Sequence, residues 1–169
     1  MEIEQNTENP QSQLKKRLLS GELSPDAFLE EIFRLDQSTS TRLDSYLNLE
    51  ILTDTNLECL FMGDLRSEYL NLLCLTYFHI GQLEAMSGPN SPLSYFEFAL
   101  EVSKGVDWED YDDWKLYVAS TISYFKQDLS ALEKNYNLMK DGRNREIVSN
   151  FIQGIKTRGG INYNEDYSR

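Results

Sequence analysis

His79 is the residue best suited to acid–base chemistry in this chain, and it is the sole histidine among 169 residues. A Ser-His-Asp or Cys-His site also needs a nucleophile held in a defined turn, and no serine or cysteine lies in a pattern such as G-x-S-x-G. A single histidine also excludes a multi-histidine metal site. We therefore interpret His79 as a surface or packing residue, and we expect no enzymatic activity, no cofactor and no metal.

The densest acidic stretch, Asp107–Asp113, has the composition of a calcium loop but not its spacing. Counted from Asp107, an EF-hand requires glycine at the position of Asp112 and a bidentate acid at the position of Val118. Helix capping and the helix dipole explain these acids. Trp108 and two further aromatic residues are interleaved with them, and aromatic anchors among acids are typical of a protein interface. A contact surface that includes Trp108 is therefore the second interpretation.

Net charge narrows the class of partner. The chain carries 28 acidic and 16 basic residues, a formal net charge of −12. Nucleic acids are bound through Lys and Arg that displace counterions, so this balance argues against a nucleic-acid partner. Residues 1–85 hold 15 acids and 6 bases, whereas residues 86–169 hold 13 and 10. Solvated helix faces explain this asymmetry, and an acidic end that faces a basic partner is the alternative.

The sequence contains no signal for membrane insertion or secretion. No apolar run reaches the roughly 18 residues of a spanning helix. The polar, acidic stretch MEIEQNTENPQSQ lacks the apolar core of a signal peptide. Cys59 and Cys74 lie in apolar helical surroundings, and we interpret both as reduced and buried. These features predict a cytoplasmic protein without a membrane partner, and they leave its oligomeric state open.

Capping and breaking residues divide the chain into about seven or eight helices. Ser24-Pro25 and Ser91-Pro92 each place a capping hydroxyl before a proline, and Gly105 occupies the position of a left-handed helix end. Between such signals apolar residues recur at helical spacing, and no stretch alternates as a strand would. We expect helices over residues 11–20, 114–127, 128–140 and 144–158, and four more that begin after Ser24, Thr41, Asp64 and Ser91.

This pattern predicts one all-α domain. We expect a disordered amino terminus at residues 1–10, a single helical-repeat domain over residues 11–158, and a flexible carboxyl-terminal tail at residues 159–169. A chain of this length buries roughly 70% of its unfolded surface, which suffices for a core.

Two of the expected helices resemble a tetratricopeptide repeat over residues 70–105. NLLCLTYFHIG contains a Leu-small pair and the aromatic Tyr77 before Gly81, and SYFEFALEVSKG follows with Phe96 and, three positions later, Ala99. This order of large and small residues matches the repeat, and it lets two antiparallel helices pack closely. A weaker copy spans Lys115–Lys140, although its offset of 47 residues exceeds the roughly 34-residue period of the family.

The resemblance implies a fold and a binding surface. The fold would be antiparallel helical hairpins stacked as a short tetratricopeptide-like right-handed superhelix, with the first helix of each hairpin lining a concave groove. The groove face of the first hairpin would be Glu68, Asn71, Leu72, Leu75, Phe78 and His79. That of the second would be Lys115, Val118, Ala119, Ile122, Phe125 and Lys126. Coverage of these positions by neighbouring helices is the alternative.

The aromatic pairs of these helices divide between two roles. Tyr77, Tyr95, Phe96 and Tyr124 fall on faces that the repeat pattern turns inward, so we expect them to pack. Phe78 lies about 100° around the helix from Tyr77 and is therefore assigned to the groove.

The sequence thus favours a non-enzymatic interaction module that binds a protein segment in a concave helical groove. An asparagine such as Asn71, beside apolar and cationic side chains, suits an extended peptide backbone. The alternative is a small acidic inhibitor, of the immunity-protein type, that blocks a basic site on its partner. Binding through an acidic face should weaken steeply with ionic strength, whereas binding in an apolar groove should not.

Overall fold

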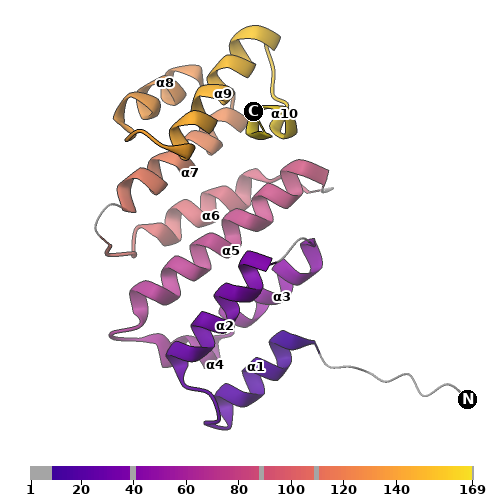
Figure 1. Cartoon of the computed structure of the whole chain (residues 1–169), viewed down its shortest axis with the longest axis vertical. Coiled ribbons are helices and arrows are strands. Elements are labelled where there is room, and N and C mark those ends of the chain that lie inside the picture. The colour runs from indigo at the N-terminus through magenta and orange to yellow at the C-terminus, as the bar shows by residue number, and fades with distance from the viewer. Residues whose placement is uncertain (1–8, 39–40, 88–89, 109–110, 169) are drawn as a thin grey trace, which may run out of the picture.

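The expected all-α class is confirmed. The computed structural model describes residues 9–38, 41–87, 90–108 and 111–168, and these form ten α-helices and one short 3-10 helix with no strand (Figure 1). The elements are α1 (Pro10–Leu19), α2 (Pro25–Ser38), α3 (Arg42–Leu52), α4 (Thr55–Glu58), η1 (Cys59–Phe61), α5 (Arg66–Ser87), α6 (Leu93–Ser103), α7 (Tyr111–Phe125), α8 (Leu129–Leu138), α9 (Arg143–Arg158) and α10 (Tyr163–Ser168).

Several helix boundaries follow directly from capping chemistry. α2 begins at Pro25, and the side chain of Asp128 accepts a hydrogen bond from the Ala131 N–H at 3.0 Å to begin α8. Gly159 caps the end of α9, and its φ of 71° is the left-handed geometry that glycine adopts readily. Our expectation of a left-handed helix end at Gly105 is wrong, because the backbone of Gly105 is not left-handed.

Gly105 is instead a point of close approach between segments. A Cβ on this residue would lie 2.7 Å from Cδ1 of Leu70 on α5, far inside van der Waals contact. The missing side chain therefore lets the segment after α6 lie against α5, at the start of the loop that leads to Trp108.

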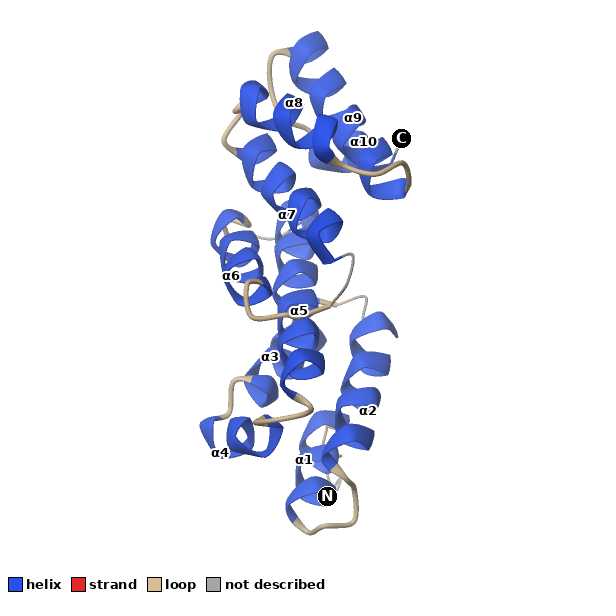
Figure 2. Cartoon of the chain, turned by 90° about the vertical axis from the view of Figure 1, so that its left-hand side faces the viewer, coloured by secondary structure: helices blue, strands red, loops and turns tan. Residues whose placement is uncertain are grey.

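The helices follow one another along the long axis of the molecule, from α1 at one end to α8 and α9 at the other (Figures 1 and 2). The longest helix, α5, lies centrally and packs against α2, α3, α6 and α10. α5 and α6 are consecutive and in extensive contact. α7 and α8 likewise pack on each other, and α9 packs on both.

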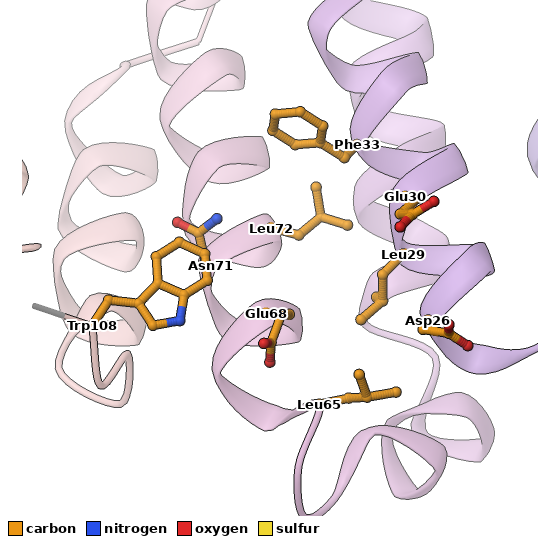
Figure 3. A pocket seen from close by; sticks show the side chains of 9 residues that line it. All are labelled: Asp26, Leu29, Glu30, Phe33, Leu65, Glu68, Asn71, Leu72 and Trp108. Atoms are coloured by element: carbon orange, nitrogen blue, oxygen red, sulfur yellow. The ribbon is translucent and has the colours of Figure 1, made fainter.

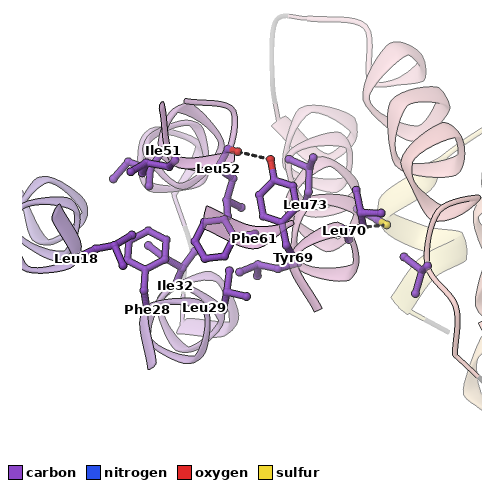
Figure 4. Packing of buried hydrophobic residues seen from close by; sticks show 14 of the residues in the cluster. Leu18, Phe28, Leu29, Ile32, Ile51, Leu52, Phe61, Tyr69, Leu70 and Leu73 are labelled. Atoms are coloured by element: carbon purple, nitrogen blue, oxygen red, sulfur yellow. Dashed lines mark hydrogen bonds between the residues drawn. The ribbon is translucent and has the colours of Figure 1, made fainter. Parts of the chain in front are cut away.

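The core consists of two apolar clusters. One joins α1 to α5, where the rings of Phe28, Phe61 and Tyr69 stack with centroids 5.8 and 5.2 Å apart. The Tyr69 hydroxyl donates to the carbonyl of Leu52 at 2.6 Å, so this buried polar group is satisfied (Figure 4). The other cluster joins α5 to α10 and includes the stacked rings of Tyr124 and Phe151.

The residues expected to pack between helices are mostly buried. Phe96, Ala99 and Tyr124 are fully buried, while Tyr77 is half-buried and stacks on Phe98. Tyr95 is also half-buried, with its hydroxyl 2.7 Å from that of Tyr46 on α3. The large-small pattern in the sequence therefore marks inter-helix contacts.

One buried carboxylate connects two helices and the loop between α5 and α6. Glu84 on α5 accepts hydrogen bonds from the Tyr46 hydroxyl at 2.9 Å and from the Asn90 N–H at 3.1 Å, and it faces Arg42 at 3.5 Å. Burial alone raises the pKa of Glu84, but these donors and Arg42 together hold it below its ordinary value of 4.5. Glu84 is therefore an ionised link between α3, α5 and the loop that precedes α6.

The carboxyl-terminal segment differs from our expectation of a flexible tail. Residues Tyr163–Ser168 form α10, and Tyr163 is only 4% exposed, beneath the rings of Tyr124, Phe125 and Phe151. Asp166 is buried and accepts a hydrogen bond from the Tyr124 hydroxyl at 2.7 Å. Tyr163 and Asp166 thus dock a short helix that composition alone suggested would be free.

One of our two expectations for the cysteines is wrong. Cys74 is buried, as expected, whereas Cys59 is exposed in η1, and both are free thiols. None of the helices in the described ranges is long and apolar enough to cross a membrane.

Candidate functional site

A groove of about 530 Å3 lies between α2 and α5 (Figure 3). α2 forms one wall, α5 forms the floor, and Trp108, in the loop before α7, forms the second wall. The residues that line it are Asp26, Leu29, Glu30, Phe33, Leu65, Glu68, Asn71, Leu72 and Trp108.

The groove has an apolar floor and an acidic rim. Leu72, only 2% exposed, lies at the bottom, whereas Phe33 keeps 45% of its surface exposed although it is a large aromatic residue. Asp26, Glu30 and Glu68 are exposed at the edges, and no basic residue lines this groove. An apolar hollow bordered by charges of one sign is the composition of a binding surface rather than of a packed core.

The acids at the rim are available to a ligand. A hydrogen bond from Ser24, followed by those from backbone N–H groups, lowers the pKa of Asp26 below its ordinary value of 3.8. Glu30 and Glu68 form no ion pair with any residue in the described part of the chain. The rim therefore presents carboxylates without cations of the chain to balance them.

The loop that carries Trp108 is held in place on both sides. Before it, Val106 is buried in the first core cluster, and the Asp107 N–H donates to Oγ of Ser67 on α5 at 2.9 Å. After it, the Tyr111 ring contacts Trp108 edge to face, with centroids 5.9 Å apart. The wall of the groove is therefore formed before any ligand arrives, which lowers the ordering cost of binding.

Asn71 provides a directional polar group inside the groove. Its Oδ1 accepts a hydrogen bond from the Tyr111 hydroxyl at 2.9 Å, and burial raises the pKa of Tyr111 so that this hydroxyl keeps its proton. The amide NH2 of Asn71 donates to no described residue, and it is free to donate to a carbonyl of a bound segment.

The same two helix faces continue into a smaller cavity of about 180 Å3. It lies one turn beyond Phe33 and is lined by Asp36, Gln37, His79, Gln82, Leu83 and Met86. Nδ1 of His79 is 2.6 Å from Oδ2 of Asp36, whose side chain is fully buried. His79 therefore covers a buried carboxylate, and neither oxygen of Asp36 accepts a hydrogen bond from a described residue.

The structure brings together four of the residues expected to bind a partner. Glu68, Asn71, Leu72 and Trp108 all line the groove. His79 lines the smaller cavity, and Leu75, half-buried, lies between these two sets on the same face of α5.

The expected groove position of Phe78 needs correction. Phe78 is 4% exposed, and its ring packs against Phe96, Trp114 and Tyr117 at centroid distances of 5.2 to 5.7 Å. It points toward α6 and α7 rather than toward α2, because the rings of Trp114 and Tyr117 on α7 cover that side of α5.

The expected groove face of α7 is not part of the site. Lys115 pairs with Asp112 at 3.4 Å, and Lys126 pairs with Glu97 on α6 at 2.7 Å. Val118 and Ile122 are buried, Ala119 and Phe125 are half-buried, and the Phe125 ring lies beneath Tyr163 of α10 at 5.4 Å. The chain's own carboxyl-terminal helix thus covers part of this face.

The sequence interpretation missed the α2 wall. Asp26, Glu30 and Phe33 are spaced four and then three residues apart, so they share one face of the helix. Acids that border an aromatic residue on one helical face are a signal that could have identified it. Only packing against α5 shows that Leu29, rather than Phe33, turns to the core.

Comparisons of the chain with protein-family models, with curated proteins and with solved structures found no match. In the described ranges, no group of three or more His, Cys, Asp or Glu residues is placed to hold a metal ion.

Proposed function

We propose that this protein is a non-enzymatic interaction module that binds a segment of a partner protein in the groove between α2 and α5. The observation that carries the proposal is the preformed groove itself, with its exposed Phe33, its anchored Trp108 wall and the free amide of Asn71.

We further propose that the helices form tetratricopeptide-like hairpins in a right-handed array. α5 with α6 and α7 with α8 would be successive hairpins, and α2 would be the first helix of an earlier one, with α3 as its second. In this arrangement α2 and α5 are equivalent first helices, which accounts for a groove between them. The fit of Phe96 against Gly81 supports the hairpin of α5 and α6.

The size and lining of the groove favour a peptide segment over a small metabolite. An apolar floor of leucines with few polar groups gives little to orient a small polar substrate. A chain segment, in contrast, places one large side chain on Leu72 while a backbone carbonyl meets Asn71.

Selection of peptides from a displayed random library tests this function. The full-length protein is the target, and the selected peptides are then measured against Phe33→Ala/Trp108→Ala. Both residues are substantially exposed, at 45% and 42%, so these changes should leave the fold intact. The control is Phe98→Ala/Leu138→Ala, which removes two apolar residues that are also exposed, at 55% and 61%, but lie outside the groove.

We expect the groove variant to lose at least tenfold in affinity and the control to stay within twofold of the wild type. This factor corresponds to the loss of about 1.4 kcal/mol or more, a modest value for two aromatic residues at a binding surface. Peptides that bind the groove variant as tightly as the wild type, or a library that yields no binder, would rule out the proposed site.

A further inference from the structure

We propose that the segment bound in this groove is cationic, with a bulky apolar residue flanked by Lys or Arg. This inference rests on the proposed function and names the chemical class of its partner. It follows from the charge of the groove lining, from the way that charge is distributed over both walls, and from the second cavity beyond it.

The negative charge of the groove lining is not balanced by any basic residue in the lining. Three of its nine residues are carboxylates, and none is basic. The bases nearest in sequence face other partners, since Arg34 pairs with Glu31, the Arg66 guanidinium donates to the sulfur of Met62, and Lys104 pairs with Glu101. A cationic segment would therefore gain attraction at the rim without displacing an existing ion pair.

The carboxylates are placed for charges on both sides of an apolar anchor. Asp26 and Glu30 lie one turn apart on the α2 wall, whereas Glu68 projects from α5 across the groove (Figure 3). An apolar side chain on the floor at Leu72 would lie between them. The exposed face of Trp108 adds a surface on which a Lys or Arg head group stacks favourably.

The second cavity continues the same surface along the molecule. It extends the α2–α5 faces and contains the buried carboxylate of Asp36, neither oxygen of which accepts a hydrogen bond from a described residue. α2 spans about 20 Å at a helical rise of about 1.5 Å per residue. An extended segment of roughly six residues covers that length. Such a segment would meet the rim acids near one end, apolar groups along its middle, and His79 above the buried Asp36 near the other end.

An acidic or neutral segment fits less well. Its carboxylates would face Asp26, Glu30 and Glu68 with no lining cation to offset the repulsion. Like-charge placement of this kind is a common device by which interfaces reject the wrong partner.

Two readouts of one display experiment test this inference. The first is the frequency of Lys, Arg, Asp and Glu among peptides selected on the full-length wild type, compared with the unselected library. The second is their affinity, at about 50 mM salt, for Glu30→Lys/Glu68→Lys. The matched control is Glu50→Lys/Glu58→Lys, which makes the same net charge change at two exposed positions outside the groove.

We expect enrichment of Lys and Arg on both sides of an apolar residue. We also expect at least a tenfold loss of affinity in Glu30→Lys/Glu68→Lys, and less than a threefold loss in Glu50→Lys/Glu58→Lys, because charges outside the groove act only at long range through screening ions. Selection on the charge-reversed protein should enrich Asp and Glu instead.

The outcomes separate this inference from the proposed function. Peptides that require Phe33 and Trp108 but show no enrichment of Lys and Arg would overturn the cationic class and leave the groove as a binding site. Equal losses in the two charge variants would also overturn it, because net charge rather than the groove would then govern binding. Failure to obtain any groove-dependent peptide would remove both proposals.

Discussion

Gly81→Ala is the substitution that probes the α5–α6 contact most sharply, because its sign depends on that contact. In an exposed helix interior, alanine in place of glycine stabilises by about 1 kcal/mol. Gly81 is buried, however, and a Cβ there would lie 2.6, 2.8 and 3.0 Å from Cε1, Cδ1 and Cζ of Phe96. Carbon atoms in ordinary contact are about 3.5 to 4.0 Å apart, so the ring would have to retreat by roughly 1 Å.

The Phe96 ring has little room to retreat. It is fully buried, and it packs against Phe78 and Phe125 with centroids 5.2 and 5.6 Å apart. Overpacking of this kind costs about 1 to 3 kcal/mol. This penalty more than offsets the gain in helix propensity, so we expect Gly81→Ala to lower the free energy of unfolding by as much as about 2 kcal/mol.

A double-mutant cycle isolates the steric contribution. In a Phe96→Leu background, the ring that the new methyl group meets is gone, and Gly81→Ala should become neutral or stabilising. In a Phe98→Leu background, where the replaced ring is 55% exposed on the same helix, Gly81→Ala should cost as much as in the wild type. Urea unfolding followed by circular dichroism measures each free energy. Stabilisation by about 1 kcal/mol in every background would refute the close contact between the two helices.

Three further predictions concern single residues. A thiol reagent should label Cys59 rapidly and Cys74 only on unfolding, because Cys74 is buried and burial raises the pKa of its thiol to about 11. Comparable labelling rates for the two thiols at neutral pH would contradict the burial of Cys74. Glu84→Gln should destabilise by about 1 to 3 kcal/mol at pH 7. Because the folded state lowers the pKa of Glu84 below 4.5, the stability that this ionised carboxylate contributes is present above pH 4.5 and is lost as the pH falls through the folded-state pKa. The difference in stability between Glu84→Gln and the wild type should therefore narrow in acid. A difference that stays constant with pH would show that the ionisation of Glu84 does not contribute to stability. Tyr163→Ala should lower the free energy of unfolding by about 3 kcal/mol, whereas the exposed neighbour Ile161→Ala should change it by less than about 0.5 kcal/mol; equal effects would mean that α10 does not dock as described.

The all-α class could be predicted from the sequence because its signals are local. Helix starts at Pro25 and Asp128 and the end at Gly159 depend on one or two residues each, and the structure places boundaries there. The fully buried Phe96 and Ala99 were also predictable, because large and small residues at helical spacing have few alternatives when two consecutive helices pack.

The candidate site was only half predictable, because a groove has two walls that are distant in sequence. Glu68 and Asn71 share a face of α5 and were identified from that helix alone. The α2 wall depends on how α2 and α5 face each other, and no pattern within either helix specifies that angle. Phe78 was misplaced for a related reason, since the position of α7 decides which side of α5 is covered.

The carboxyl-terminal segment could not be predicted from the sequence for a different reason. INYNEDYSR is polar and short, and a helix of six residues has little stability in isolation. It is ordered by contacts with residues far away in sequence, including the aromatic rings of α7 and α9 and the Arg158–Asp166 ion pair. Tertiary packing of this kind does not appear in a local pattern.

Site-specific photo-crosslinking tests the central claim of a binding groove most directly. A photoreactive residue is placed at Glu68, on the exposed rim, or at Phe98, which is also exposed but lies outside the groove. Each protein is then irradiated with a peptide selected on the wild type. If the groove binds the peptide, a covalent adduct should form at position 68 and should disappear when excess unlabelled peptide is added. No adduct above background should form at position 98. An adduct that forms at position 98 while position 68 stays unmodified would contradict it.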